Sequence, residues 1–129
     1  MSKLEEKIIT LLQKDGYRFR REKSYKDLNK GKYRFDFEVY VDGAPVLVEI
    51  QGNQHYQRVQ KFFHSRKDFL KQQERDRRKI SYCIVHGIPL YVIPYWEVEK
   101  LSSAKEIFQE KYLAKSMWKN DIDWIDKKI

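Results

Sequence analysis

The sequence predicts an α/β fold: one domain with a mixed central β-sheet and helices on its faces. An Asp42-Gly43 pair between two strand-like runs predicts an antiparallel hairpin. A strand–helix–strand passage from residues 46–51 to residues 90–93 favours a parallel pair joined by a right-handed crossover. Because 129 residues suit one domain, we treat 1–129 as a single domain, with a core over about 2–95 and a C-terminal helix and tail over 96–129.

The first element is an amphipathic helix. Ser2 followed by Glu5 makes a capping box for a helix that continues to about Lys14. Its apolar stripe consists of Leu4, Ile8, Leu11 and Leu12. The segment "YRFRREKSY", residues 17–25, then alternates weakly and predicts a curved strand before the turn "LNKGK".

The second half of the chain begins with "GNQHYQRVQKFFHS", residues 52–65, which predicts an irregular, lid-like loop. A long basic helix follows over residues 66–86 and ends at Gly87. The segment "IPLYVIPYW" is a strand with prolines near both ends, and residues 102–118 form a final helix capped by Ser102 or Ser103.

The Asp42-Gly43 turn fixes the register of the hairpin. If these two residues form the loop, the numbers of cross-strand partners sum to 85. One face is then apolar and holds the pairs Val41–Ala44, Val39–Val46, Phe37–Val48 and Phe35–Ile50. The other face pairs Glu38 with Leu47, Asp36 with Glu49, and Arg34 with Gln51. A bulged three-residue loop is the alternative that would shift this register.

Two facing carboxylates need a compensating cation. The β-carbons of directly opposed residues lie about 4.5–5.5 Å apart, so Asp36 and Glu49 would repel each other. Arg34 beside them is one candidate, and a divalent metal is the other. Mg²⁺ takes one or two carboxylates together with water and phosphate oxygens, which suits phosphodiester hydrolysis.

Composition favours a folded protein with a polyanionic partner. Hydrophobic residues make up 41% and charged residues 36%, with 27 Lys and Arg against 19 Asp and Glu, a net charge of +8. This balance favours nucleic acid, ahead of an acidic membrane surface, while a basic surface that only keeps the protein soluble is the alternative. No run is apolar enough to cross a membrane, no signal peptide is evident, and the single Cys83 excludes an internal disulfide.

The spacing of the acids resembles a known nuclease superfamily. Asp36 followed by Glu49-Ile50-Gln51 at the end of the next strand resembles the PD-(D/E)XK motif, with Gln in place of the usual Lys. Four longer segments resemble the branch of the very short patch repair endonucleases, with its small phage and mobile-element nucleases. They are "SKLEEKIITLL", "RFDFEV", "VEIQGNQHY" and "RDRRKISYCIVHGIPLYVIPY", and the similarity spans roughly residues 2–95. It implies a restriction endonuclease-like core.

The resemblance implies roles for individual residues. Asp36 and Glu49 would be metal ligands with the Ile50 carbonyl, and Glu5 would approach the same metal, although its capping role explains it equally well. His55 would orient or deprotonate water, or protonate the leaving oxygen. With Gln51 these residues would form the catalytic set Asp36, Glu49, Gln51 and His55.

Basic residues would contact the DNA backbone rather than read bases. We expect this role for Arg58, Lys61, Arg66, Lys67, Arg75 and Lys79. Asp76 and Lys79 would lie one helical turn apart near the site, and a surface ion pair between them is an equally good explanation.

Two positions depart from the pattern of the branch. Gln51 stands where the branch tends to have Asp and the superfamily Lys, and glutamine carries no charge, although it can hold a water molecule. Val92-Ile93 stands where an Arg often precedes Ile-Pro, which removes one phosphate contact.

The sequence therefore predicts a Mg²⁺- or Mn²⁺-dependent DNA endonuclease of phage or mobile-element type, cytoplasmic in a bacterial host. The alternative is a catalytically inactive nucleic-acid-binding module that keeps the nuclease fold, and a third interpretation is a basic protein–protein adaptor. Recognition of a long DNA site would require a homodimer or a partner protein, since the chain has little beyond the core.

Overall fold

A four-stranded mixed sheet forms the centre of the protein. The computed structural model describes residues 2–51 and 66–114. Its strands are β1 (Arg18–Ser24), β2 (Arg34–Val41), β3 (Ala44–Gln51) and β4 (Leu90–Pro94), in the spatial order β1-β2-β3-β4. The pairs β1/β2 and β2/β3 are antiparallel, whereas β3/β4 is parallel. The predicted α/β class and the parallel crossover through the long helix are confirmed.

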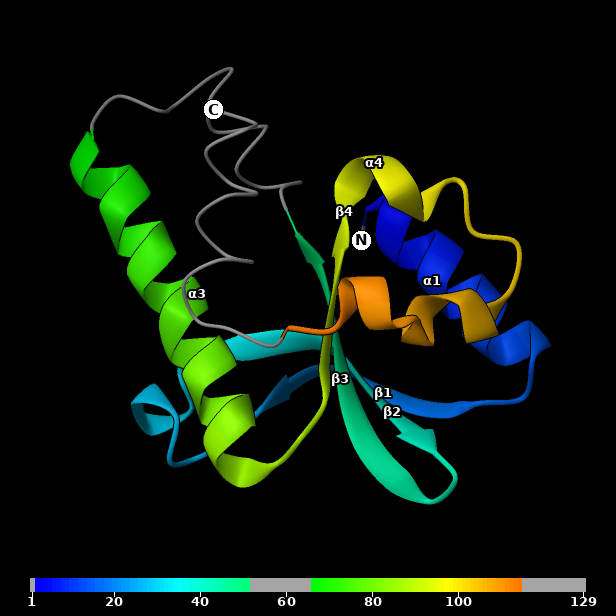
Figure 1. The fold of residues 1–129 in the computed structure, drawn as a ribbon, viewed down its shortest axis with the longest axis horizontal. Helices are drawn as coiled ribbons and strands as arrows, with labels where there is room; N and C mark the ends of the chain where they lie inside the picture. Colours follow the sequence, from blue (N-terminus) through cyan, green and yellow to red (C-terminus); the bar gives the residue numbers. More distant parts are fainter. Residues whose placement is uncertain (1, 52–65, 115–129) are drawn as a thin grey trace.

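Helices cover both faces of this sheet. They are α1 (Lys3–Lys14), α3 (Arg66–His86) and α4 (Tyr95–Val98), with the 3₁₀ turns η1 (Asn29–Gly31), η2 (Ala104–Phe108) and η3 (Glu110–Tyr112). Figure 1 shows α3 on one side of the sheet and α1, α4 and η2 on the other. The fold therefore has three layers, and each face of the sheet has a different cover.

The first helix begins as its sequence predicts. The N–H of Glu5 donates to Ser2 Oγ at 3.1 Å, and the Ser2 hydroxyl donates to Glu5 Oε1 at 3.3 Å. Ser2 thus satisfies one of the backbone N–H groups left without a partner at a helix start. Ile8, Leu11 and Leu12 are buried against the sheet.

The hairpin register is confirmed where the two strands pair. Asp42 and Gly43 have φ values of 53° and 81°, the left-handed backbone that a type I′ turn requires at both positions. Val41 pairs with Ala44, Val39 with Val46, and Phe37 with Val48.

The predicted face of Phe35 is wrong. The pairing of β2 with β3 ends at Phe37–Val48, and Phe35 packs on the α3 side of the sheet. Here Asp36 Oδ2 accepts the N–H of Ile50 at 2.7 Å, so a side chain takes a place that a backbone carbonyl would fill in a regular ladder. Across from Asp36 on β1, Glu22 has a φ of 52°, and β1 kinks at that point. The distortion turns Phe35 away from the face of Phe37.

The predicted final helix over residues 102–118 is also wrong for its described part. Two short 3₁₀ turns, η2 and η3, occupy this stretch, and Gln109 between them is extended, with φ −87° and ψ 147°. Ser103 does mark a start, because its N–H donates to the Glu106 carboxylate at 2.9 Å. Ile107 and Tyr112 are buried in the apolar core on the α1 side of the sheet, and tertiary packing of this kind commonly overrides local helix propensity. Residues 115–118 lie outside the described residues.

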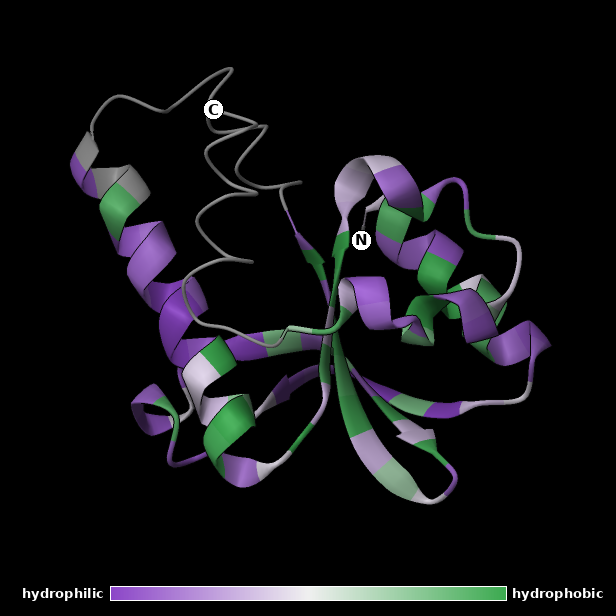
Figure 2. Ribbon diagram, viewed as in Figure 1, coloured by the Kyte–Doolittle hydropathy of each residue, from purple (hydrophilic) through white to green (hydrophobic). Residues whose placement is uncertain are grey.

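The two faces of the sheet have different cores. The first core, under α1, α4 and η2, is apolar and includes Ile8, Leu12, Phe37, Val39, Val48, Ile93, Val98 and Ile107. The second core, under α3, holds Leu28, Phe35, Leu47, Ile80, Cys83 and Leu90. Figure 2 shows that α3 is hydrophilic over most of its length and hydrophobic mainly near its C-terminal end. Cys83 is the buried hydrophobe that a lone cysteine predicts.

Buried polar side chains gather on one side of the molecule. They are Glu38, Glu49, Gln72, Gln73, Asp76 and Lys79, all on β2, β3 or α3. Over residues 2–51 and 66–114, no helix combines the length and the apolar character that a membrane span needs.

Candidate functional site

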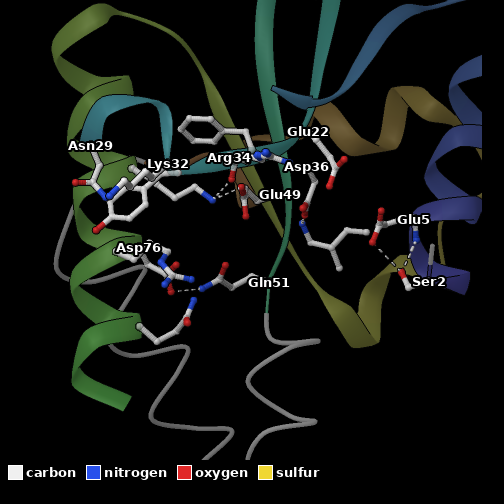
Figure 3. Close-up of a pocket in the computed structure, with 16 residues that line it drawn as sticks. Ser2, Glu5, Glu22, Asn29, Lys32, Arg34, Asp36, Glu49, Gln51 and Asp76 are labelled. Carbon is white, nitrogen blue, oxygen red and sulfur yellow. Dashed lines mark hydrogen bonds and ion pairs between the residues drawn. The ribbon is translucent and has the colours of Figure 1, made fainter. Parts of the chain in front are cut away.

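A pocket of about 490 Å³ lies where β2 and β3 face α3, and α1 closes it on the far side. Figure 3 shows Glu5, Glu22 and Asp36 toward α1, Asn29 and Lys32 toward α3, and Glu49 between these groups. The remaining residues that line it include Ser2, Tyr33, Arg34, Ile50, Gln51, Gln72, Arg75, Asp76 and Lys79. The pocket therefore joins an acidic region, Glu5, Glu22, Asp36 and Glu49, to a basic one, Lys32, Arg34, Arg75 and Lys79.

Asp36 lies at the point where β2 leaves β3. Its carboxylate accepts the N–H of Ile50 at 2.7 Å. Burial raises the pKa of Asp36, and the charges of Glu5 and Glu22 add to this, while the Ile50 N–H and Lys79 oppose it. Burial therefore outweighs the two groups that favour the ionised form of Asp36.

Glu49 is buried in the middle of the pocket, with 9% of its surface exposed. Burial and the charge of Asp36 raise its pKa to about 8, against the attraction of Lys79. The influence of Asp36 on Glu49 shows that the two predicted acids are neighbours, although the β-ladder itself ends one pair before them.

Lys79 provides the cation that faces these acids. Its ammonium donates to Glu49 Oε1 at 2.5 Å and to the backbone carbonyl of Arg34 at 2.5 Å, and it lies 4.8 Å from the centre of the Phe35 ring. Burial alone would lower the pKa of Lys79, but Glu49, Asp36 and Asp76 together raise it. Only 8% of Lys79 is exposed, so its predicted place on the surface is wrong, whereas its contact with a phosphate stays a prediction.

Gln51 has a partner on the same helix. Its Nε2 donates to Asp76 Oδ2 at 2.9 Å, and Figure 3 shows the two side chains meeting across the pocket. The site therefore receives Asp76 and Lys79 together from successive turns of α3. Arg34, the other predicted counterion, contributes its carbonyl, while its side chain is exposed.

Glu5 caps the first helix and also lines the pocket, while its binding of a metal stays a prediction. Its carboxylate accepts from the Ser2 hydroxyl, pairs with Arg21 at 3.3 Å, and lines the pocket. Because its charge also raises the pKa of Asp36, the helix cap and the acidic region share this residue.

The structure describes the side chains of some of the residues that the sequence predicts to contact DNA. Lys67 is exposed on α3, and Arg75 lines the pocket with its guanidinium 5.6 Å from the centre of the Tyr33 ring. Arg75 Nε is buried and has no hydrogen-bond partner within the described part of the chain. His55, Arg58 and Lys61 lie outside the described residues, as does the side chain of Arg66.

Sequence reasoning missed the contact between Lys79 and Glu49. A signal for it exists in α3, where the buried residues Gln72, Asp76, Lys79 and Cys83 recur at intervals of three or four. This spacing defines the side of a helix that faces the protein. The buried side of α3 is polar from Gln72 to Lys79 and apolar at Cys83. Such a pattern predicts a polar site beneath the polar part of the helix.

The acids fit a magnesium ion bound by few protein ligands. Over residues 2–51 and 66–114, no three His, Cys, Asp or Glu side chains are grouped as they would be to hold a metal ion. Mg²⁺, however, takes one or two carboxylates and completes its shell with water and phosphate oxygens. Asp36 and Glu49 are hard oxygen donors that line the same pocket, so they suit such an ion.

Comparisons with known proteins give one partial similarity. No protein-family model and no solved structure matches the chain. The chain is similar to the uncharacterized protein 094L of Frog virus 3 (isolate Goorha), with 38% identity over 61 residues. The similarity covers 46% of this chain and 39% of the viral protein, so the chain spans about two fifths of that relative's length.

Proposed function

We propose that the protein is a Mg²⁺- or Mn²⁺-dependent endodeoxyribonuclease of phage or mobile-element type that hydrolyses phosphodiester bonds in DNA. The observation that carries this proposal is a pair of carboxylates, the half-buried Asp36 and the buried Glu49, which line one pocket and both have raised pKa values. The basic residues on its other side and the net charge of +8 favour a polyanionic substrate. We propose the cytoplasm as the compartment in which such an enzyme acts.

Each part of the pocket has a role in this proposal. Asp36 and Glu49 would hold the metal, which when bound supplies Lewis-acid polarisation of the phosphate and activation of water. Gln51, fixed by Asp76, presents an amide oxygen that can accept a hydrogen bond from water. Arg75 and Lys67 offer positive charge to backbone phosphates.

Cleavage of a panel of linear, nicked, mismatched and four-way-junction DNAs tests the proposal. With Mg²⁺ or Mn²⁺, the wild type should cut at least one form, and Asp36→Asn should cut about a hundredfold more slowly or worse. Asparagine retains an oxygen that can accept the Ile50 N–H, so the fold should survive.

Glu38→Gln is the matched control for Asp36→Asn. Glu38 is a buried acid on the same strand that accepts from the Tyr25 and Tyr40 hydroxyls and does not line the pocket. Its variant should keep the cleavage rate within about threefold. If all DNA forms stay intact with either metal, the proposal fails.

A non-catalytic nucleic-acid-binding module is the second candidate. The observation in its favour is that Glu49 is already paired with Lys79 and Gln51 with Asp76, so these groups are satisfied without a metal. Such a module would bind DNA with the same affinity with or without Mg²⁺, in wild type and in Asp36→Asn alike.

A further inference from the structure

Polar side chains of β3 and α3 form two contacts with each other across the pocket. On β3, Glu49 and Gln51 point to α3, and on α3 Asp76 and Lys79 point back to β3. The acid of the strand binds the lysine of the helix, and the amide of the strand binds the acid of the helix. Gln51 stands on β3 at the position where the superfamily motif has a lysine, so this position carries no charge. A lysine from α3, Lys79, lies next to Glu49 instead.

Packing alone does not explain Lys79. Moving an ammonium and a carboxylate out of water costs several kcal/mol per ion, and an apolar pair of similar volume is often as stable. The next buried residues of α3, Ile80 and Cys83, show that apolar side chains fit under this helix. Burial of Lys79, which is 8% exposed and lines the pocket, therefore costs free energy that an apolar residue at this position would not.

The hydrogen bonds of Lys79 leave room for a ligand. An ammonium has three N–H donors. Within the described part of the chain two acceptors are assigned to it, Glu49 Oε1 and the Arg34 carbonyl. The contact also engages one of the two oxygens of Glu49, which leaves the other for a metal.

We propose that Lys79 is a catalytic residue that supplies, from α3, the fixed positive charge that Gln51 does not provide, and donates its third N–H to an oxygen of the phosphodiester. This inference rests on the proposed nuclease function and deepens it. Its contact with Glu49 and with the Arg34 carbonyl holds the charge in place before the substrate arrives, as electrostatic stabilisation of a transition state requires.

The proposed role predicts effects of opposite sign on metal binding and on cleavage. A fixed cation beside Asp36 and Glu49 repels a divalent metal and attracts a phosphate. At a pH high enough to keep Glu49 ionised, removing its charge should therefore strengthen Mg²⁺ binding while it slows hydrolysis. A residue that only supports the fold would weaken both when it is replaced.

The test uses the full chain with Lys79→Gln, measuring Mg²⁺ affinity by calorimetry without DNA and cleavage under single turnover. We expect the Mg²⁺ Kd to fall about threefold or more and the cleavage rate to fall about a hundredfold or more. Lys71→Gln is the matched control, because Lys71 is an exposed lysine of the same helix that does not line the pocket. It should leave both quantities within about twofold.

Two further variants keep the result decisive. Lys79→Arg retains the charge and should keep Mg²⁺ affinity near that of wild type, with cleavage faster than in Lys79→Gln. Adding Gln51→Lys to Lys79→Gln returns a charge to β3 and should raise cleavage about tenfold over the single variant.

The outcomes separate this inference from the proposed function. Wild-type protein that binds no Mg²⁺ and cuts no DNA overturns the nuclease proposal and the role of Lys79 with it. Wild type that binds Mg²⁺, with Lys79→Gln binding it more weakly, overturns the role of Lys79 alone. A double variant that cuts no faster than Lys79→Gln overturns it as well.

Discussion

The two faces of the central sheet differ in what they bury. Under α1 and η2, the side chains with no exposed surface are apolar, among them Ile8, Phe37 and Ile107. Under α3, the apolar cluster shares its face with charged groups such as Glu49 and Lys79. Hydrophobic burial is the main source of stability, whereas burial of a charge costs free energy even when it is paired.

This difference suggests a division of roles within one small domain. The first core stabilises the fold, and the α3 face gives up some stability to hold acids and a lysine in a pocket. Variants of the buried apolar residues should therefore unfold the protein, while variants of the polar residues on the α3 face should change its binding and chemistry with smaller effects on folding.

The largest expected loss of stability is at Phe37, which is fully buried in the first core. Phe37→Ala should lower the free energy of unfolding by about 3–5 kcal/mol, because it removes a large apolar side chain and leaves a cavity. Urea denaturation followed by circular dichroism measures this. Leu70→Ala, at an apolar residue of α3 that is 44% exposed, should change it by less than about 0.5 kcal/mol. A Phe37→Ala variant as stable as Leu70→Ala would contradict the division of roles.

In metal-free protein, the ionised side chain of Glu49 should lower the free energy of unfolding, in contrast to Phe37, whose side chain raises it. Its pKa rises from an ordinary value of 4.5 to about 8 on folding, so the folded state binds its proton more tightly than the unfolded state does. The stability this provides is complete below pH 4.5 and is lost as the pH rises through about 8. Glu49→Gln removes this loss, so wild type should lose more stability than Glu49→Gln between pH 5 and pH 8.5.

Denaturant midpoints at several pH values, with EDTA present, test this expectation. Saturating Mg²⁺ should reduce the pH dependence of wild type, because a bound cation stabilises the ionised carboxylate. Identical pH profiles for wild type and Glu49→Gln would contradict the raised pKa.

A smaller effect is expected at Arg75, whose Nε lacks a partner in the described part of the chain. If Arg75 contacts a phosphate, Arg75→Gln should weaken metal-free DNA binding and reduce the slope of log K against log salt by about 1. Fluorescence anisotropy at several salt concentrations measures the slope. Arg20→Gln is the control, since Arg20 is exposed on β1 and does not line the pocket. Equal slopes for the two variants would show that Arg75 makes no special phosphate contact.

The smallest expected effect is at the start of α1. Ser2→Ala removes the acceptor for the Glu5 N–H and should lower the free energy of unfolding by about 1 kcal/mol. Ser2→Gly should cost only a few tenths of a kcal/mol, because glycine is tolerated at this position. Thermal and urea unfolding distinguish the two, and equal stabilities of wild type and Ser2→Ala would exclude the cap as a stabilising contact.

The features that local chemistry determines could be predicted from the sequence. The Asp42-Gly43 turn gave the register as far as Phe37–Val48, since both residues take the left-handed backbone that the turn needs. The bounds of α3 followed from its basic helical run and from Gly87. The predicted direct pairing of Asp36 with Glu49 is wrong, because the ladder ends at Phe37–Val48, although both residues line the same pocket.

The features that depend on contacts between distant segments could not be predicted. Phe35 changes face because Asp36 binds the Ile50 N–H, which no alternation pattern encodes. Lys79 meets Glu49 across 30 residues of sequence, and only the packing of α3 on β3 brings them together. The turns η2 and η3 stand where the sequence pattern predicts a helix, and both present buried residues, Ile107 and Tyr112, to the first core.

Calorimetric titration with Mg²⁺, repeated with Mn²⁺, tests most directly whether the acidic region of the pocket binds a divalent metal. We predict saturable binding to wild type and to the control Glu38→Gln, and a Kd at least about tenfold higher for Asp36→Asn. No binding to wild type, or the same Kd for wild type and Asp36→Asn, would contradict the assignment of Asp36 and Glu49 as metal ligands.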